Sequence, residues 1–186
     1  MIATHALSTP LEPGQVRALR AGHVVYLTGT LLAGREDAHQ RLTAQLDAGE
    51  APPVDLRGAV IYYTGPSPLT PLRPIGSAGP SSAWRMDPFT PPLHRAGLAG
   101  SIGKGQRGPE VAQALREHGA VYFGATGGAG ALLSLCVRRV RPVAYPDLGP
   151  EALFELVVDK FPLVVLCDSL GNSHHAAPDL ERALRG

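Results

Sequence analysis

The sequence predicts a mixed α/β fold, and the order of its strand-like and helical segments points to this class. Strand-like runs alternate with amphipathic helical segments through the centre of the 186-residue chain, and further strand-like runs cluster near its end. The 22 glycines and 18 prolines predict many tight turns and fixed loops between these elements. We expect a single domain over residues 1–186, with a flexible N-terminus over about 1–12 and a C-terminal tail over about 172–186.

The N-terminal half is expected to begin with a short helix over residues 13–20. A strand follows over 23–30, where consecutive valine, tyrosine and leucine residues favour extended backbone. Residues 34–47 predict a helix, because apolar residues recur at four-residue spacing and two acids lie in its first turn. A second strand at 59–64 leads into a loop rich in proline, glycine and serine over 65–83.

The C-terminal half is expected to alternate helices with short strands. Residues 85–96 are interrupted by proline and predict only a partial helix. Residues 110–118 predict a full helix, with apolar residues one turn apart and Gly119 behind them. The glycine-rich stretch 124–130 predicts a turn that opens an apolar helix reaching residue 137. Strands are expected at 101–102, 120–123, 142–145, 153–158 and 163–167.

Charge and hydropathy exclude several classes of partner. The net charge of +1 gives no electrostatic footprint for nucleic acid. No apolar stretch reaches the length of a membrane span, so we expect no membrane association. The first fifteen residues contain no lysine, arginine or apolar core of a signal peptide, and we therefore expect a cytoplasmic protein.

The two cysteines exclude a metal cluster held by this chain alone. Cys136 and Cys167 both lie in apolar runs, where a free thiol behaves as a small buried hydrophobe. An iron–sulfur cluster needs several thiolates, and these two cysteines are 31 positions apart. The adjacent pair His174 and His175 lacks a third ligand, and neighbouring side chains point apart, so a tail is the better interpretation. We expect no metal site within this chain.

Two loops bring together the residue types that bind a small polyanion. Residues 79–87 read Gly-Pro-Ser-Ser-Ala-Trp-Arg-Met-Asp, and residues 102–105 read Ile-Gly-Lys-Gly. Glycine lets backbone approach a ligand closely, arginine binds carboxylates through a planar fork, and lysine supplies a compact charge. The alternative is a glycine-rich surface loop with solvated charges, and spacing alone favours neither interpretation.

The 79–87 segment resembles the Gly-Pro-Thr-Thr-x-x-Arg-Met-Asp segment of class I iron–sulfur fumarases and L-tartrate dehydratases. The likeness is to their beta subunit, or to the C-terminal region of single-chain members. Further segments agree in the same order and extend the resemblance over roughly residues 10–175. These segments are Thr28–Thr30 with Gly34–His39, Pro53–Asp55 with Ile61–Pro66, Ile102–Gly105, Gly127–Ala129 and Asp147–Gly149.

The resemblance implies a swivelling β/β/α domain, a mixed sheet with flanking helices. It implies the beta subunit of a hydro-lyase that reversibly hydrates fumarate to malate and is active only with an alpha subunit. The 4Fe-4S cluster would then be held by that alpha subunit, in a hetero-oligomer for which a dimer of heterodimers is one arrangement. The alternatives are the beta subunit of an L-tartrate dehydratase, a dicarboxylate-binding module without catalysis, and an assembly scaffold.

The resemblance also implies the site residues. It places Arg85 and Lys104 among the ligands of a four-carbon dicarboxylate, and Ser81 at the hydroxyl residue that acts as catalytic base at C3. Here serine stands where the family pattern usually has threonine, and Ser82 is the rival for the role. A neutral hydroxyl is a poor base, so nearby cations would have to lower its pKa.

Arg35 completes the expected set of anion ligands. It lies at the start of the expected 34–47 helix, where free backbone N–H groups and the helix dipole favour an anion. The alternative is that Arg35 pairs with Glu36 or Asp37, or faces solvent. His39, one turn later, is expected to be structural.

Overall fold

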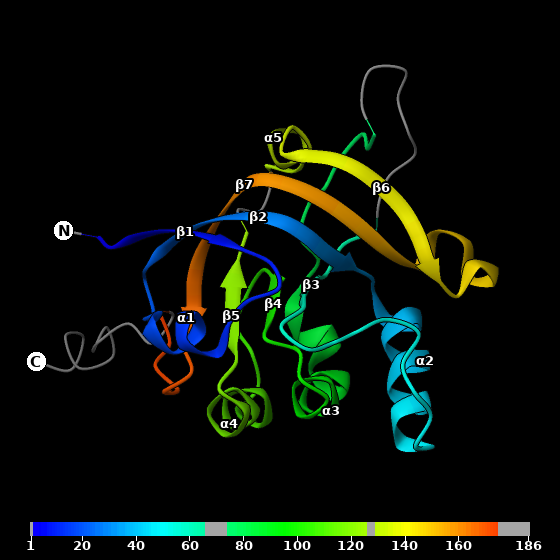
Figure 1. Cartoon of the computed structure of the whole chain (residues 1–186), viewed down its shortest axis with the longest axis horizontal. Helices are drawn as coiled ribbons and strands as arrows, with labels where there is room; N and C mark the ends of the chain where they lie inside the picture. Colours follow the sequence, from blue (N-terminus) through cyan, green and yellow to red (C-terminus); the bar gives the residue numbers. More distant parts are fainter. Residues whose placement is uncertain (1, 66–73, 126–128, 175–186) are drawn as a thin grey trace, which may run out of the picture.

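The computed structural model of the chain describes residues 2–65, 74–125 and 129–174. Within these residues, seven strands form one mixed sheet, and helices cover part of it (Figure 1). The expected α/β class and the mixed sheet with flanking helices of the β/β/α fold are confirmed. No helix in the described ranges is both long and apolar enough to cross a bilayer.

The sheet combines a parallel run with one long antiparallel strand. Its order is β1-β2-β3-β4-β5-β7-β6; strands β1 to β5 run parallel to one another, and β7 is antiparallel to β2, β5 and β6. Because β7 also pairs with β2, strands β2, β3, β4, β5 and β7 form a closed ring. The strands are β1 (Thr4–Ser8), β2 (Val24–Ala33), β3 (Val60–Tyr62), β4 (Gly100–Gly103), β5 (Val121–Gly124), β6 (Val137–Ala144) and β7 (Leu153–Cys167).

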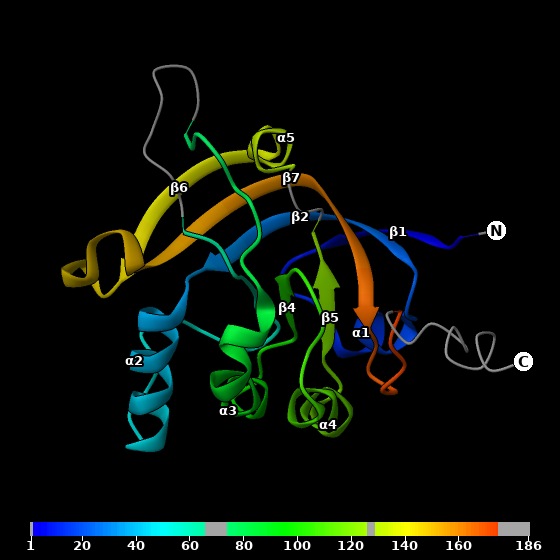
Figure 2. The same cartoon turned by 180° about the vertical axis from the view of Figure 1, so that it is seen from behind.

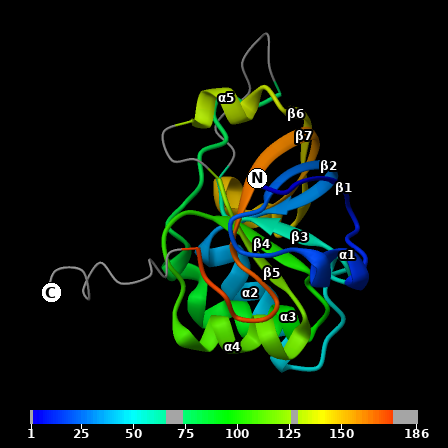
Figure 3. The same cartoon turned by 90° about the vertical axis from the view of Figure 1, so that its left-hand side faces the viewer.

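The helices lie at opposite ends of the molecule. α2, α3 and α4 are grouped at one end, whereas α5 lies at the other, beside the arch of β6 and β7 (Figures 2 and 3). The helices are α1 (Pro13–Ala18), α2 (Glu36–Asp47), α3 (Thr90–Arg95), α4 (Pro109–His118) and α5 (Gly130–Ser134), with short 3-10 helices η1 (Ala83–Phe89) and η2 (Pro146–Glu151).

Two apolar cores occupy the two faces of the central strands. Successive side chains of a strand point to opposite faces, so Tyr62 packs into one core while its neighbours Ile61 and Tyr63 pack into the other. The first core lies among the strands and includes Leu27, Phe123 and Phe161. The second packs the strands against α2, α3 and α4, through the residues Leu42, Leu93, Val111 and Leu115.

Most expected elements are present, and three differ. The expected flexible N-terminus contains β1, which pairs with β2 over five residues. The strands expected at 153–158 and 163–167 are one strand, β7, because the intervening residues form a bulge rather than a loop. At that bulge Lys160 has a φ of 50°, and its N–H donates to the Thr28 hydroxyl.

The third difference is at α5. The helix expected to reach residue 137 ends at Ser134, and Val137 already begins β6 by pairing with Val158. Of the expected C-terminal tail, Ser173 bridges to Cys167 and the His174 N–H donates to the Leu166 carbonyl. His175 and the rest of the tail lie outside the described residues.

Candidate functional site

The carboxyl ends of the parallel strands place two of the four expected site residues at one edge of the sheet. Arg35 follows β2 by two residues, and Lys104 directly follows β4, with β3 between the two strands. Ligand sites of α/β folds commonly lie beyond the carboxyl ends of the parallel strands, where the loops that follow the strands gather. The order of the strands therefore brings Arg35 and Lys104 to the same side of the molecule.

Backbone hydrogen bonds join the Ser81–Ala83 segment to Lys104. The Ser81 N–H donates to the Tyr63 carbonyl at 2.7 Å, and the Lys104 N–H donates to the Ser81 carbonyl at 3.2 Å. The Ala83 N–H then donates to the Lys104 carbonyl at 2.9 Å, and Ser82 forms a parallel bridge with Lys104. The segment thus extends the sheet beyond the ends of β3 and β4, which sets the half-buried Ser81 and Ser82 beside Lys104.

Gly103 makes this close approach possible. A Cβ at Gly103 would lie 2.8 Å from Cδ2 of Tyr63 and 3.0 Å from the Cβ of Ala83. Any larger residue would push the Ser81–Ala83 segment away from β4. In the Gly-Lys sequence, Gly103 therefore has a steric role, in addition to the charge that Lys104 supplies.

Both expected arginines already hold carboxylates. Nη2 of Arg85 lies 2.5 Å from Oε1 of Glu36 in the first turn of α2, and Arg35 pairs with Glu151 of η2. The alternative pairing of Arg35 with Glu36 or Asp37 is not seen. Because Glu36 follows Arg35 in the chain, its ion pair draws Arg85 toward Arg35. All four expected residues therefore belong to one region of the molecule.

Lys104 differs from the two arginines of this region in having no carboxylate partner among the described residues. Among the described residues, no carboxylate lies within 4.0 Å of its ammonium group, and its side chain is exposed. An exposed ammonium group with no carboxylate partner in the described part of the chain is available to an incoming anion. Lys104 is thus the residue whose state in the structure best fits a ligand-binding role.

His39 is buried and supports the turn that carries Arg35. Its Nδ1 lies 2.7 Å from the Arg35 carbonyl, so an Nδ1–H donates to that oxygen. Burial lowers the pKa of His39 to about 4, which leaves the imidazole neutral at pH 7. Nε2 then carries no proton, and it has no hydrogen-bond partner among the described residues. The expected structural role fits this geometry.

A buried ion pair beneath the two loops was missed by the sequence interpretation. Nε of Arg107 donates to Oδ1 of Asp87 at 2.6 Å, and the side chain of Arg107 is 1% exposed. The other carboxylate oxygen of Asp87 accepts from the Gly108 N–H at 2.7 Å. Asp87 ends the 79–87 motif, but nothing in the sequence marks Arg107 as its partner.

The chain's own thiols do not fit an iron–sulfur cluster. Both cysteines are free, and burial raises the pKa of Cys136 and of Cys167, which favours neutral thiols over thiolate ligands. Within the described ranges, no group of three or more metal-ligating side chains comes together. These two thiols alone do not provide the ligand set of such a cluster.

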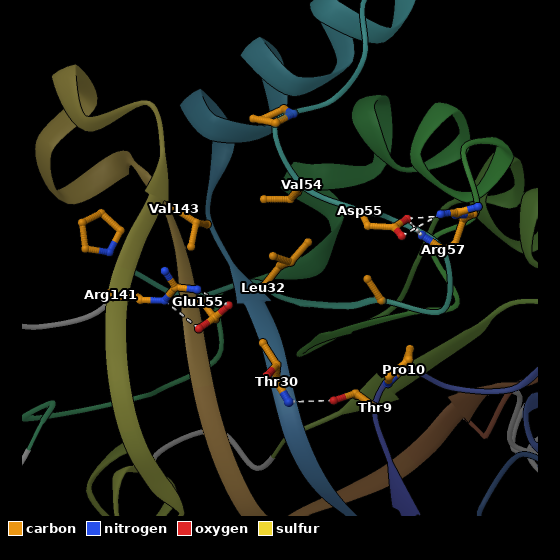
Figure 4. Close-up of a pocket in the computed structure, with 13 residues that line it drawn as sticks. Thr9, Pro10, Thr30, Leu32, Val54, Asp55, Arg57, Arg141, Val143 and Glu155 are labelled. Carbon is orange, nitrogen blue, oxygen red and sulfur yellow. Dashed lines mark hydrogen bonds and ion pairs between the residues drawn. The ribbon is translucent and has the colours of Figure 1, made fainter.

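A separate cavity of about 590 Å³ lies between β2, the β6–β7 pair and the 53–59 segment, and it contains none of the expected site residues (Figure 4). Its charged side chains pair with one another. Arg141 donates twice to Glu155, at 2.8 and 2.9 Å, and Arg57 lowers the pKa of Asp55 to about 2. Each charge in the cavity is matched there, whereas Lys104 at the strand edge has no carboxylate partner among the described residues, so we prefer the strand edge as the anion site.

Comparison with known proteins identifies the family that the sequence resembles. Residues 4–177 match the family model described as Fumarase C-terminus. The chain belongs to this family. The expected resemblance is thereby confirmed, whereas the roles of the individual site residues stay predictions.

Curated relatives include both kinds of enzyme named by the resemblance. "Fumarate hydratase class I, anaerobic" of Escherichia coli is 39% identical over 148 residues, which are 78% of this chain and 27% of that protein. "Fumarate hydratase class I, aerobic" of the same organism is 36% identical over 161 residues, 86% of this chain and 29% of that protein. A provisionally named L(+)-tartrate dehydratase subunit beta of Methanocaldococcus jannaschii is 36% identical over 169 residues, 88% of this chain and 87% of that protein.

The chain thus spans less than a third of these two fumarate hydratases, but most of the tartrate dehydratase subunit.

Proposed function

We propose that this chain is the beta subunit of a hydro-lyase that reversibly adds water to fumarate to form malate. The observation that supports it best is the pairing of the Ser81–Ala83 segment with Lys104 at the carboxyl edge of the strands. This pairing sets two serines beside a lysine that has no carboxylate partner among the described residues, and Arg85 and Arg35 are linked to the same region through Glu36. Such a set suits a substrate with a carboxylate at each end.

The cations would bind the two carboxylates of the substrate. A dianion leaving water needs charge-assisted donors at both ends. Arg85 and Arg35 are already paired with glutamates, so a substrate carboxylate would take the place of Glu36 or Glu151. Lys104 needs no such exchange with a described residue. We assign these three residues to substrate binding.

Ser81 would move the proton at C3. Its backbone is hydrogen-bonded to that of Lys104, which sets this half-buried residue beside one cation of the candidate site. Positive charge nearby stabilises an alkoxide and lowers the pKa of a hydroxyl, which makes it a better base. Ser82 has similar exposure and is the alternative base.

A 4Fe-4S cluster on a partner alpha subunit would supply Lewis-acid chemistry to the substrate. The comparisons support a partner, because the M. jannaschii relative is named as a subunit beta and the fumarate hydratases extend far beyond the matched region. We therefore propose a hetero-oligomer, such as a dimer of heterodimers, in the cytoplasm. No role for nucleic acid or membrane is proposed.

L-Tartrate dehydration is the second candidate. The M. jannaschii relative is matched over 87% of its length, and its name assigns it to that reaction. The same cations would bind tartrate, which also carries two carboxylates on a four-carbon chain. Substrate assays have to separate the two reactions.

Reconstitution tests the proposal. The chain would be purified alone and also co-expressed with the cluster-bearing subunit of the same organism. Fumarate, L-tartrate and a methylated fumarate would be assayed in parallel under anaerobic conditions. We expect the isolated chain to be colourless, iron-free and inactive, and the complex to be brown, oxygen-sensitive and active on fumarate.

Stoichiometric iron and activity in the isolated chain would contradict the two-subunit proposal. A cluster-loaded complex that turns over none of the three substrates would leave the binding module or the scaffold as the function. A complex active on L-tartrate alone would replace fumarate as the substrate.

A further inference from the structure

The buried Arg107–Asp87 pair connects the two chain segments that carry the candidate site. Asp87 follows Arg85 by two residues within η1, and Arg107 follows Lys104 by three residues. Nε of Arg107 and the Gly108 N–H occupy the two oxygens of the Asp87 carboxylate. One carboxylate thus joins the segment bearing Ser81 and Arg85 to the segment bearing Lys104.

The remaining donors of Arg107 bind groups around the same segments. Nη1 donates to the Tyr63 hydroxyl at 3.1 Å and to the Ser101 hydroxyl at 3.2 Å. Nη2 donates to the Thr90 hydroxyl at 2.6 Å, and that hydroxyl donates in turn to the Met86 carbonyl. One buried guanidinium therefore links the residue after β3, Ser101 within β4, η1 and the first residue of α3 to one another.

The guanidinium also lies over two aromatic rings. Its central carbon lies 5.1 Å from the ring centre of Tyr63 and 4.8 Å from that of Tyr122. The backbone carbonyl of Tyr63 receives the Ser81 N–H, and the Tyr122 hydroxyl donates to the Gly105 carbonyl at 2.9 Å. Tyr63 is thus hydrogen-bonded to the Ser81 segment through its backbone, and Tyr122 to the segment that follows Lys104 through its hydroxyl.

This arrangement is better suited to fixing geometry than to adding stability. A buried ion pair gains little net stability, because the desolvation of two charges offsets much of their attraction. A planar guanidinium with several bound N–H groups does, however, define the directions of its partners, which an ammonium group cannot. The network lies beneath the site and not at its surface, since Arg107 is almost completely buried.

We propose that the Arg107–Asp87 pair is the positioning element that sets the Ser81–Arg85 segment relative to Lys104. The inference rests on the proposed function for its catalytic consequence. Its structural consequence can be measured on the isolated chain. Neither residue is proposed to touch the substrate.

The test compares a variant of this pair with a matched control pair. The double substitution Asp87→Asn with Arg107→Met removes both charges and leaves no unpaired ion in the interior. The control is Asp55→Asn with Arg57→Met, which removes an exposed arginine–aspartate pair at the other cavity. Arg107→Lys is a third variant that keeps the charge and loses the fork.

Amide hydrogen exchange, followed by NMR on the full isolated chain, is the first measurement. In the Asp87/Arg107 variant, exchange should rise about tenfold or more at the amides of Ala83 and Lys104, which bond across the two segments. Amides of β2 should keep their protection, and the control pair should change neither group. Arg107→Lys should show the same local pattern with a smaller increase.

Kinetics of the complex with the alpha subunit is the second measurement. We expect kcat/KM to fall about 10- to 100-fold in the Asp87/Arg107 variant, with a raised KM, while the control pair stays at the wild-type value. Unchanged protection of the Ala83 and Lys104 amides would overturn the positioning role, and so would a uniform rise in exchange over the whole chain. Locally increased exchange, together with an inactive wild-type complex, would support the positioning role and contradict the proposed function.

Discussion

At the scale of single residues, the candidate site is a set of cations with different partners. Arg85 and Arg35 hold glutamates, whereas Lys104 is exposed and holds no described carboxylate. An ion pair between partly exposed side chains contributes little, about 0–1 kcal/mol, so its exchange for a substrate carboxylate costs little. The glutamates thus keep the arginines oriented without blocking the site.

Ser81 is the most sharply testable single residue. If its hydroxyl moves the C3 proton, Ser81→Ala should lower kcat of the reconstituted enzyme by about 10²–10⁴-fold with little change in substrate binding. Ser81→Thr should keep substantial activity because it restores the hydroxyl, and Ser82→Ala should lose much less. Steady-state kinetics, with cluster content checked for each variant, makes the comparison.

A greater loss for Ser82→Ala than for Ser81→Ala would transfer the role to Ser82. Near-normal turnover in both alanine variants would place the base outside this loop.

The local sequence could predict the candidate site residues but not the hydrogen-bond network of Arg107 beneath them. Ser81, Arg85 and Lys104 lie in short motifs, so local sequence is enough to find them. The partners of Arg107 lie up to 44 positions away in the chain, and they meet only because β3 and β4 are adjacent in the sheet. No local pattern carries that information.

At the scale of elements, the site depends on how closely the Ser81–Ala83 segment approaches β4. Parallel strands place their carboxyl ends together, and the backbone bonds to Lys104 then add this segment at the edge. Gly103 is the position at which side-chain volume would oppose that approach.

Substitution of Gly103 tests this packing. Gly103→Ala should lower the free energy of unfolding by about 1–3 kcal/mol, because its Cβ overlaps the ring of Tyr63. Gly14→Ala in α1 is the control, since nothing lies within 4 Å of its new Cβ and alanine favours a helix. Urea unfolding of the isolated chains gives both values. Equal stability of the two variants would show that the edge is more loosely packed than the structure indicates.

The elements that local sequence could not predict are those that depend on distant pairing. β1 is a five-residue edge strand that acquires its partner only when β2 is in place. The polar residues around Lys160 resemble a loop, but β2 pairs with β7 on both sides of them and keeps one continuous strand. Helices α2 and α4, by contrast, follow the four-residue apolar spacing that predicted them.

At the scale of the whole molecule, two buried histidines should make stability depend on pH. Burial lowers the pKa of both His39 and His94 to about 4, from an ordinary value of 6.5. Below pH 6.5 the unfolded chain binds protons that the folded chain does not, so acid favours unfolding. The stability associated with these neutral histidines is fully present above pH 6.5, and it is lost as the pH falls toward about 4.

The expected loss of stability in acid is large enough to measure. Each histidine should lower the free energy of unfolding by about 2 kcal/mol between pH 7 and pH 5, as estimated from the shift. The carboxylates whose pKa values are lowered by arginine, such as Asp55 and Glu155, lose their contribution only at more acidic pH. Urea unfolding at pH 7 and pH 5 makes the measurement on the isolated chain.

A His39→Gln/His94→Gln variant should show a much weaker pH dependence over this range, whatever its absolute stability. Equal stability of the wild-type chain at both pH values would contradict the buried neutral state of these histidines.

The central claim is that the edge at Lys104, and not the cavity between β2 and the β6–β7 pair, binds the dicarboxylate. The most direct measurement is kcat/KM of the reconstituted complex for Arg85→Ala and Arg141→Ala. Each of these exposed arginines is paired with a glutamate, but Arg85 is at the edge and Arg141 lines the cavity. Loss of a charge-assisted contact costs about 1.5–3 kcal/mol, so Arg85→Ala should reduce kcat/KM by about one to two decades while Arg141→Ala leaves it unchanged. A wild-type value for Arg85→Ala together with a large loss for Arg141→Ala would contradict the account.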